Sequence, residues 1–213
     1  MGFFRRERFT QSLQGATAQI SCRGGELAAE LAAVRMRPSF ITGYVSPHLD
    51  IERIARQIHE RFPGVTLSLS SSAGELCGSE GRLYCDASGQ WDRLVLALFD
   101  SRVLLSAELV SVPLESQDIR AGGARMSLRE RIGKLTRSLQ ALQVKTPIDA
   151  RDTLAYVLFD GLSASESFFM EALYESGRFP CLFVGGSAGG MDQCRQVGNN
   201  GVNAVAEVGV ERD

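Results

Sequence analysis

The chain contains one short sequence pattern twice, and this repeat constrains the fold more than any other feature. The first copy begins with Arg61-Phe62-Pro63 and ends with Ser72-Ala73-Gly74. The second begins with Arg178-Phe179-Pro180 and ends with Ser187-Ala188-Gly189. The copies begin 117 residues apart and end 115 residues apart (61 to 178, and 72 to 187), so they differ by a two-residue insertion. Each copy leads an apolar segment into a turn of small residues. Two matched turns of this kind predict one ligand site between them.

Each copy lies in a strand–helix–strand pattern. In the first, residues 40–45 form a strand, Asp50 is a helix N-cap, residues 51–62 form an amphipathic helix and residues 65–70 form a strand. In the second, a strand over 153–159, a helix from Ser163 to Ser176 and a strand over 181–184 follow in the same order, and Gly177 ends the helix. Such units join parallel strands by a right-handed crossover. The sequence therefore predicts an α/β fold with duplicated βαβ units in a mixed, mostly parallel sheet.

The segments outside the two units predict an addition to this sheet. Residues 25–36 are rich in alanine, leucine and glutamate and predict a helix. Residues 82–86 predict a short strand. Residues 93–99 and 103–112 predict two longer strands on either side of Asp100-Ser101, a dipeptide that is typical of a tight turn. We therefore expect these two strands to form an antiparallel hairpin.

The longest expected helix covers residues 126–143. Large aliphatic residues recur in it at alternating spacings of four and three: Leu128, Ile132, Leu135, Leu139 and Leu142. This seam spans two heptads, which is short for a coiled coil. Packing in the core is the preferred interpretation, and a homodimer or a signalling helix stays open.

Composition and charge exclude several classes of protein. The formal charge is −2 and the pI is about 5.8, whereas nucleic-acid-binding proteins usually have a basic surface, so we expect no nucleic-acid partner. No apolar segment reaches the ~20 residues that a membrane helix needs. Residues 1–8 lack the apolar segment of a secretory signal. The sequence predicts a cytoplasmic protein without membrane contact, and residues 1–19 predict a flexible N-terminal tail.

Four segments, taken in order, resemble the N-terminal part of a FIST domain. They are residues 43–50 (GYVSPHLD), 63–76 (PGVTLSLSSSAGEL), 158–162 (LFDGL) and 184–189 (VGGSAG). The resemblance covers residues 20–190, and residues 191–213 depart from the family pattern as an atypical terminus. Truncation and divergence of the sequence both stay open as explanations. The resemblance implies a bacterial sensory domain for signal transduction. It also implies a small polar, amino-acid-like ligand and a histidine kinase or a chemotaxis-type protein as the signalling partner.

Two loops at strand ends are the candidate ligand-binding sites. The first, residues 70–75, offers three serine hydroxyls and Glu75, which suits a ligand ammonium group. The second, residues 185–190, has four glycines that let the backbone approach a ligand closely. Asp160 and Ser46 end the preceding strands, at the edge where open α/β sheets bind ligands. A structural role in turns or caps is the competing interpretation for all of them. The ligand-binding candidates are Ser46, Ser71, Ser72, Gly74, Glu75, Asp160, Gly185, Gly186 and Ser187.

Catalysis and cofactor binding find less support in the sequence. No cluster of histidine and cysteine has zinc-ligand spacing, so we expect no metal site. The pattern G-x-S-x-G around Ser187 is that of a hydrolase nucleophile, but both histidines precede residue 60, so the order Ser–Asp–His is impossible within this chain. The FIST resemblance leaves one cofactor open, since a branch of that family consists of haem-binding nitric-oxide sensors that regulate histidine kinases. His48 and His59 are the candidate axial ligands.

Overall fold

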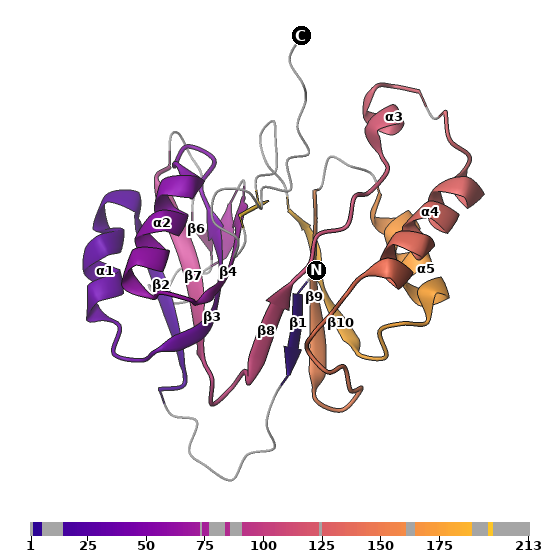
Figure 1. The fold of residues 1–213 in the computed structure, drawn as a ribbon. Coiled ribbons are helices and arrows are strands. Elements are labelled where there is room, and N and C mark those ends of the chain that lie inside the picture. Colours follow the sequence, from indigo (N-terminus) through magenta and orange to yellow (C-terminus); the bar gives the residue numbers. More distant parts are fainter. Residues whose placement is uncertain are drawn as a thin grey trace.

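The computed structural model describes residues 2–5, 15–72, 74–76, 84–85, 91–123, 125–160, 165–188 and 196–197. Two mixed β-sheets lie side by side, with two helices against the outer face of each (Figure 1). The α/β class expected from the sequence is therefore confirmed. Among the described residues, every helix is too short or too polar to span a bilayer.

The first sheet has five strands in the order β11-β4-β3-β7-β2. Its strands are β2 (Thr17–Arg23), β3 (Pro38–Val45), β4 (Thr66–Ser71), β7 (Arg93–Asp100) and β11 (Gln196–Val197). The short 3-10 turn η1 (Gly24–Glu26), α1 (Leu27–Ala33) and α2 (Ile51–Arg61) belong to this half. Asp50 caps α2 as expected, because its carboxylate accepts hydrogen bonds from the backbone N–H groups of Glu52 and Arg53.

The second sheet has four strands in the order β10-β9-β1-β8. Its strands are β1 (Gly2–Arg5), β8 (Ser106–Leu109), β9 (Thr153–Asp160) and β10 (Leu182–Ala188), and its helices are α4 (Leu128–Ala141) and α5 (Glu166–Ser176). The remaining elements are the single turn α3 (Gln117–Arg120) and the small pair β5 (Glu75–Leu76) and β6 (Tyr84–Cys85). Gly177 ends α5 with a φ of +60°, in the left-handed conformation that glycine adopts without strain.

The two βαβ units are present, but they lie in different sheets. β3 and β4 are parallel and joined by α2, while β9 and β10 are parallel and joined by α5. These are the two parallel pairs among the eight strand pairs in the described part of the chain. Each unit therefore begins a sheet of its own, and antiparallel strands complete both sheets.

The expected hairpin of β7 and β8 does not form. β7 pairs with β2 and β3 in the five-stranded sheet, whereas β8 pairs with β1 in the four-stranded sheet. The expected turn does follow β7, because Asp100 O accepts hydrogen bonds from the N–H groups of Val103 and Leu104. Ser39 Oγ then donates to Leu104 O, which holds this turn against β3. From this turn the chain continues into β8, so residues 101–105 connect the two sheets.

The N-terminal residues also differ from the expectation. Residues 2–5, expected in a flexible tail, form β1, which is hydrogen-bonded between β8 and β9. The aliphatic seam of α4 packs mainly inside the protein. Ile132, Leu135 and Leu139 are buried, while Leu128 at the start of the helix is 54% exposed. Core packing is therefore the main role of this seam.

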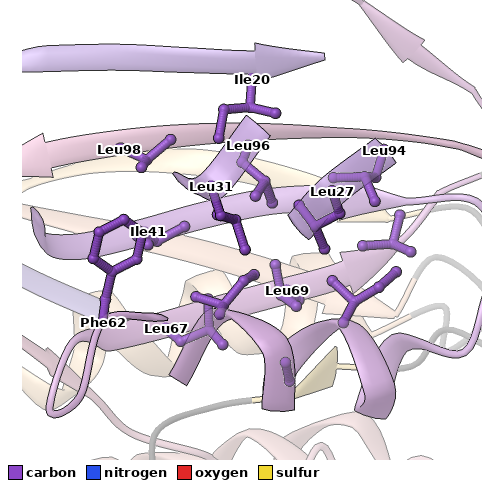
Figure 2. Packing of buried hydrophobic residues seen from close by; sticks show 14 of the residues in the cluster. Ile20, Leu27, Leu31, Ile41, Phe62, Leu67, Leu69, Leu94, Leu96 and Leu98 are labelled. Carbon is purple, nitrogen blue, oxygen red and sulfur yellow. The ribbon is translucent and has the colours of Figure 1, made fainter. Parts of the chain in front are cut away.

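Each sheet builds its hydrophobic core against its own helices. In the five-stranded half, aliphatic side chains from β2, β3, β4 and β7 meet Leu27 and Leu31 of α1 and the buried face of α2 (Figure 2). In the other half, residues of β9 meet α4 and α5 in a second cluster. Side chains alternate between the two faces of a strand, so this packing uses only one face of each sheet.

The repeated Arg-Phe-Pro motif has the same structural role in both halves. Phe62 and Phe179 are buried in the two cores. Arg61 donates to the carbonyls of Leu31 and Val34, at the C-terminus of α1. Arg178 donates to the carbonyls of Gln140 and Leu142, at the C-terminus of α4. Each arginine thus donates to carbonyls at a helix end, where intrahelical N–H donors run out.

We expect Arg61→Met and Arg178→Met each to lower the free energy of unfolding by about 1 kcal/mol, because methionine keeps an apolar stem but cannot donate to the helix carbonyls. Arg56→Met is the matched control. Arg56 lies on α2, is half-exposed and only reaches Glu52 at 4.0 Å, so its loss should cost less than ~0.5 kcal/mol. Urea unfolding measures all three variants. If Arg56→Met lowers the free energy of unfolding as much as the other two variants do, the helix-end hydrogen bonds are not what stabilises Arg61 and Arg178.

Candidate functional site

The two faces of the five-stranded sheet differ sharply in chemistry. The face toward α1 and α2 is aliphatic, as Figure 2 shows. The other face carries hydroxyl groups on β2, β3 and β4, where polar residues alternate with the core residues. Phe40 of β3 and Val95, Ala97 and Phe99 of β7 add apolar side chains to the same face. Its polar residues are Thr17, Gln19 and Ser21 on β2, Thr42 and Tyr44 on β3, and Thr66, Ser68 and Ser70 on β4. We call these residues the hydroxyl face.

The four-stranded sheet turns an apolar surface toward the hydroxyl face. On β9 and β10, residues that alternate with the core positions are Leu154, Tyr156, Leu158, Leu182, Val184 and Gly186. Leu182 is 64% exposed and Val184 is 41% exposed, so this surface is not closed by protein at β10. Hydroxyl groups opposite an aliphatic surface lose water and need hydrogen-bond partners in exchange.

Direct contacts bring the two sheets together. β8 runs beside β3 and β4, and Thr66 Oγ1 donates to Ala107 O at 3.3 Å. Further along, the hydroxyl of Tyr44 on β3 is hydrogen-bonded to the hydroxyl of Tyr156 on β9. Burial, and then this hydrogen bond, raise the pKa of Tyr156 above its ordinary value. The Tyr156 hydroxyl is therefore neutral at physiological pH, and the pair can donate to or accept from a ligand group.

Ser70 is the most informative residue of the hydroxyl face. Its side chain is fully buried, and its Oγ has no hydrogen-bond partner in the described part of the chain. Ser70 is the register neighbour of Tyr44, so its hydroxyl lies on the same face as the tyrosine pair. An unsatisfied buried hydroxyl costs about 1–3 kcal/mol, which a bound polar group would recover.

A cationic group lies at the carboxyl end of β3. Arg93 begins β7, and its guanidinium donates to Ser21 Oγ at 3.3 Å on the hydroxyl face. The neighbouring Trp91 has a buried indole N–H without a partner among the described residues, and its ring meets His48 edge-on at 5.1 Å.

At the other end of β2 and β7, a hollow of about 460 Å³ is lined by Thr17, Ala18, Gln19, Ala97, Leu98 and Phe99. This hollow lies beside Thr17 and Gln19 of the hydroxyl face.

Two of the predicted ligand-binding serines, Ser46 and Ser72, form hydrogen bonds with nearby backbone groups. Ser46 is buried, and its Oγ donates to Trp91 O at 2.6 Å and accepts from His48 N. Ser72 Oγ donates to Gly74 O at 2.6 Å and accepts from Gly74 N. Ser71 is buried on the opposite face from Ser70. The side chain of Glu75 lies outside the described residues.

The second predicted loop is explained mainly by strand packing. Ser187 Oγ donates to Glu166 Oε2 at 2.6 Å, on the side of α5. Gly185 has a φ of +153°, and a Cβ there would lie 1.8 Å from Val157 O, so only glycine fits. At Gly186 a Cβ would meet nothing within 4 Å. The backbone of Asp160 pairs with Ala188, and its side chain is not described.

The histidines lie apart from each other. His48 is exposed beside Trp91, and His59 lies on α2, against the outer face of the five-stranded sheet. The described residues contain no group of three or more metal-ligating side chains. The haem hypothesis thus rests on the family resemblance alone.

The hydroxyl face was missed in the sequence analysis, although a signal for it was present. Residues 66–70 alternate hydroxyl and leucine side chains, and only Ser70 was placed in a candidate loop. An alternation of this kind gives one aliphatic face and one hydroxyl face.

The family model described as the FIST N domain matches residues 39–211 of the chain. This range includes both βαβ units and most strands of the hydroxyl face. No curated protein and no solved structure matches the chain.

We expect Gly185→Ala to lower the free energy of unfolding by at least about 3 kcal/mol, since the new methyl group would collide with the backbone of β9. Gly186→Ala should change it by less than about 1 kcal/mol, because that methyl group enters open space. Thermal unfolding of both variants tests this difference. If both alanines are tolerated, the glycine at 185 is not required by strand packing and a ligand role becomes the better explanation.

Proposed function

Because the chain belongs to the FIST family, a family of sensory domains for signal transduction, we propose that it binds a small polar ligand between its two sheets. The observation that carries this proposal is the buried hydroxyl of Ser70 beside the tyrosine pair, which has no hydrogen-bond partner among the residues that the structure describes. A buried polar atom that lacks a partner is rare in native proteins and marks a site for water, an ion or a ligand.

The chemistry of the two surfaces supports an amino-acid-like ligand. The hydroxyls of Ser70, Tyr44 and Tyr156 offer donors and acceptors to its polar end. The guanidinium of Arg93 favours a carboxylate, since arginine and carboxylate form charge-assisted hydrogen bonds. Leu158 and Val184 offer an apolar surface to its side chain. Binding sites commonly combine an apolar lining with a few placed polar groups.

The tyrosine pair also supports a route for the signal. It links a central strand of one sheet to a central strand of the other. A ligand that bonds to either hydroxyl competes with this link, so the bound and free states prefer different separations of the sheets. A difference of this kind is what a ligand needs to shift a conformational equilibrium. The receiver of the change is a histidine kinase or a chemotaxis-type signalling protein.

We expect at least one of the twenty amino acids or the common carboxylates to raise the melting temperature of the purified chain. A ligand that binds only the folded state at a hundredfold excess over Kd stabilises it by about 2.7 kcal/mol. Ser70→Ala should weaken binding of that ligand roughly 5- to 10-fold through one lost hydrogen bond. It should not destabilise the free protein, because alanine removes a hydroxyl that has no partner in the described part of the chain.

Ser71→Ala is the matched control, since Ser71 follows in the same strand but faces the helices. It should leave ligand affinity unchanged. An identical loss of affinity in both variants, or an unchanged affinity in Ser70→Ala, would remove the hydroxyl face from consideration. No stabilisation by any compound would count against a ligand of this class.

A further inference from the structure

The helices of the four-stranded half form a layer with one basic and one acidic member. α4 has four cationic residues and one anionic residue, whereas α5 has three glutamates and no cationic residue. The net charges of the two helices are therefore +3 and −3. The helices pack side by side against the outer face of the sheet (Figure 1). The outer surface of this half is thus divided along its length into a basic and an acidic strip.

Two contacts show that α4 and α5 run in the same direction. Near their N-termini, the Arg131 guanidinium lies 5.9 Å from the ring centroid of Phe168. Near their C-termini, Thr136 Oγ1 donates to Glu175 Oε2 at 3.4 Å. The partners are 37 and 39 residues apart in the sequence (131 to 168, and 136 to 175). A residue of α4 therefore lies at the height of the α5 residue about 38 positions later.

The opposite charges of the two helices are not used inside the chain. Among the described residues, the ion pairs of α4 run to Asp118 and Glu115, which precede the helix, and none runs to α5. Arg137 of α4 and Glu171 of α5 are exposed, and neither belongs to an ion pair in the described part of the chain. These side chains are therefore available to a partner molecule.

A glycine on α4 gives such a partner room. Gly133 lies in the helix interior, where glycine is less favourable than alanine. Apart from its own helix backbone, a Cβ at Gly133 would meet only Nη1 of Arg137, at 3.6 Å, so the fold does not require glycine there. The same contact shows that the Arg137 guanidinium lies over Gly133, which is at the height of Glu171 (38 positions later).

The charges favour one way of stacking two copies of this layer. A two-fold axis parallel to the helices places α4 over α5 of the second copy, and it keeps each residue at its own height. A two-fold axis across the helices places α4 over α4 and α5 over α5. Only the first arrangement brings opposite charges together, since the second opposes +3 to +3 and −3 to −3.

We propose that a second copy of the chain docks on this layer, with α4 over α5 of the second copy and Arg137 beside Glu171 of the second copy. Leu128 on α4 and Tyr174 on α5, which are 54% and 69% exposed, add apolar surface to the same two helices. The buried seam of α4 faces its own core, so this dimer uses the opposite side of the helix.

The size of the surface predicts a weak dimer. At about 1.5 Å per residue, α4 and α5 are about 21 Å and about 17 Å long, and together they are about 20 Å wide. Each copy thus contributes roughly 400 Å², or roughly 800 Å² in total, whereas stable interfaces bury about 1,200–2,000 Å². We therefore expect an equilibrium between monomer and dimer at micromolar or higher concentrations, with more dimer at low salt.

Sedimentation equilibrium of the full chain at low salt tests this proposal. The mass should rise from that of a monomer to that of a dimer as the concentration is raised from about 1 µM to about 1 mM. Arg137→Glu and Glu171→Arg should each weaken association at least ~10-fold, because each variant opposes like charges. The variant that carries both substitutions should associate within ~3-fold of the unmodified chain, since the charges of the pair are exchanged.

Arg56→Glu is the matched control. It makes the same change of charge at an exposed position of α2, in the other half of the protein, and should leave association unchanged. Thermal unfolding at the lowest concentration shows whether each variant is folded. A monomer at every concentration, or a doubly substituted chain that stays as weak as the single variants, would overturn the proposal. Equal weakening by Arg56→Glu would also overturn it, because net charge would then be the cause.

Discussion

Burial of one face of each sheet beneath its own pair of helices is the interaction on which the rest of the structure depends. Leucines of β4 and β7 meet α1 and α2, and residues of β9 meet α4 and α5, so each half has a complete core of its own. Burial of apolar surface at roughly 25 cal/mol per Å² is the main stabilising term in such a half. The other face of each sheet takes no part in these two helix-packed cores. The five-stranded sheet uses this freedom to carry hydroxyl groups.

Local features of the fold could be predicted from the sequence because local physics determines them. Asp50 accepts from two N–H groups of its own helix, and Gly177 adopts a conformation that other residues avoid. Pairing between distant segments could not be predicted in this way. The turn after Asp100 is compatible with a hairpin, and only the competition of β2 and β3 for β7 decides against it. β1 joins a sheet whose other strands begin a hundred residues later.

The repeat that dominates the sequence records architecture more than ligand binding. Arg61 and Arg178 hold helix ends, Phe62 and Phe179 fill the cores, and Gly185 allows β10 to approach β9. These roles account for the same residue types at matched positions without a ligand. The candidate site lies on the face of the sheet opposite to the core, at Ser70 and Tyr44, and its importance depends on the other sheet, which carries Tyr156. Sequence alone reveals the alternation of side chains, but it does not reveal which surface faces them.

The cost of the hydroxyl face is an argument for its function. A domain of this size is stable by only about 5–15 kcal/mol, and one unsatisfied buried hydroxyl consumes about 1–3 kcal/mol of that. Alanine at position 70 would avoid this cost and keep the same backbone. The Ser70 hydroxyl therefore contributes most to stability when a group bonds to it. Because Ser70 neighbours Tyr44, whose hydroxyl links the two sheets through Tyr156, we propose that such a bond also affects the distance between the sheets. A candidate site whose hydroxyl gains most from a bound partner, and which is linked to both halves of the protein, has the physical properties that the proposed sensor requires.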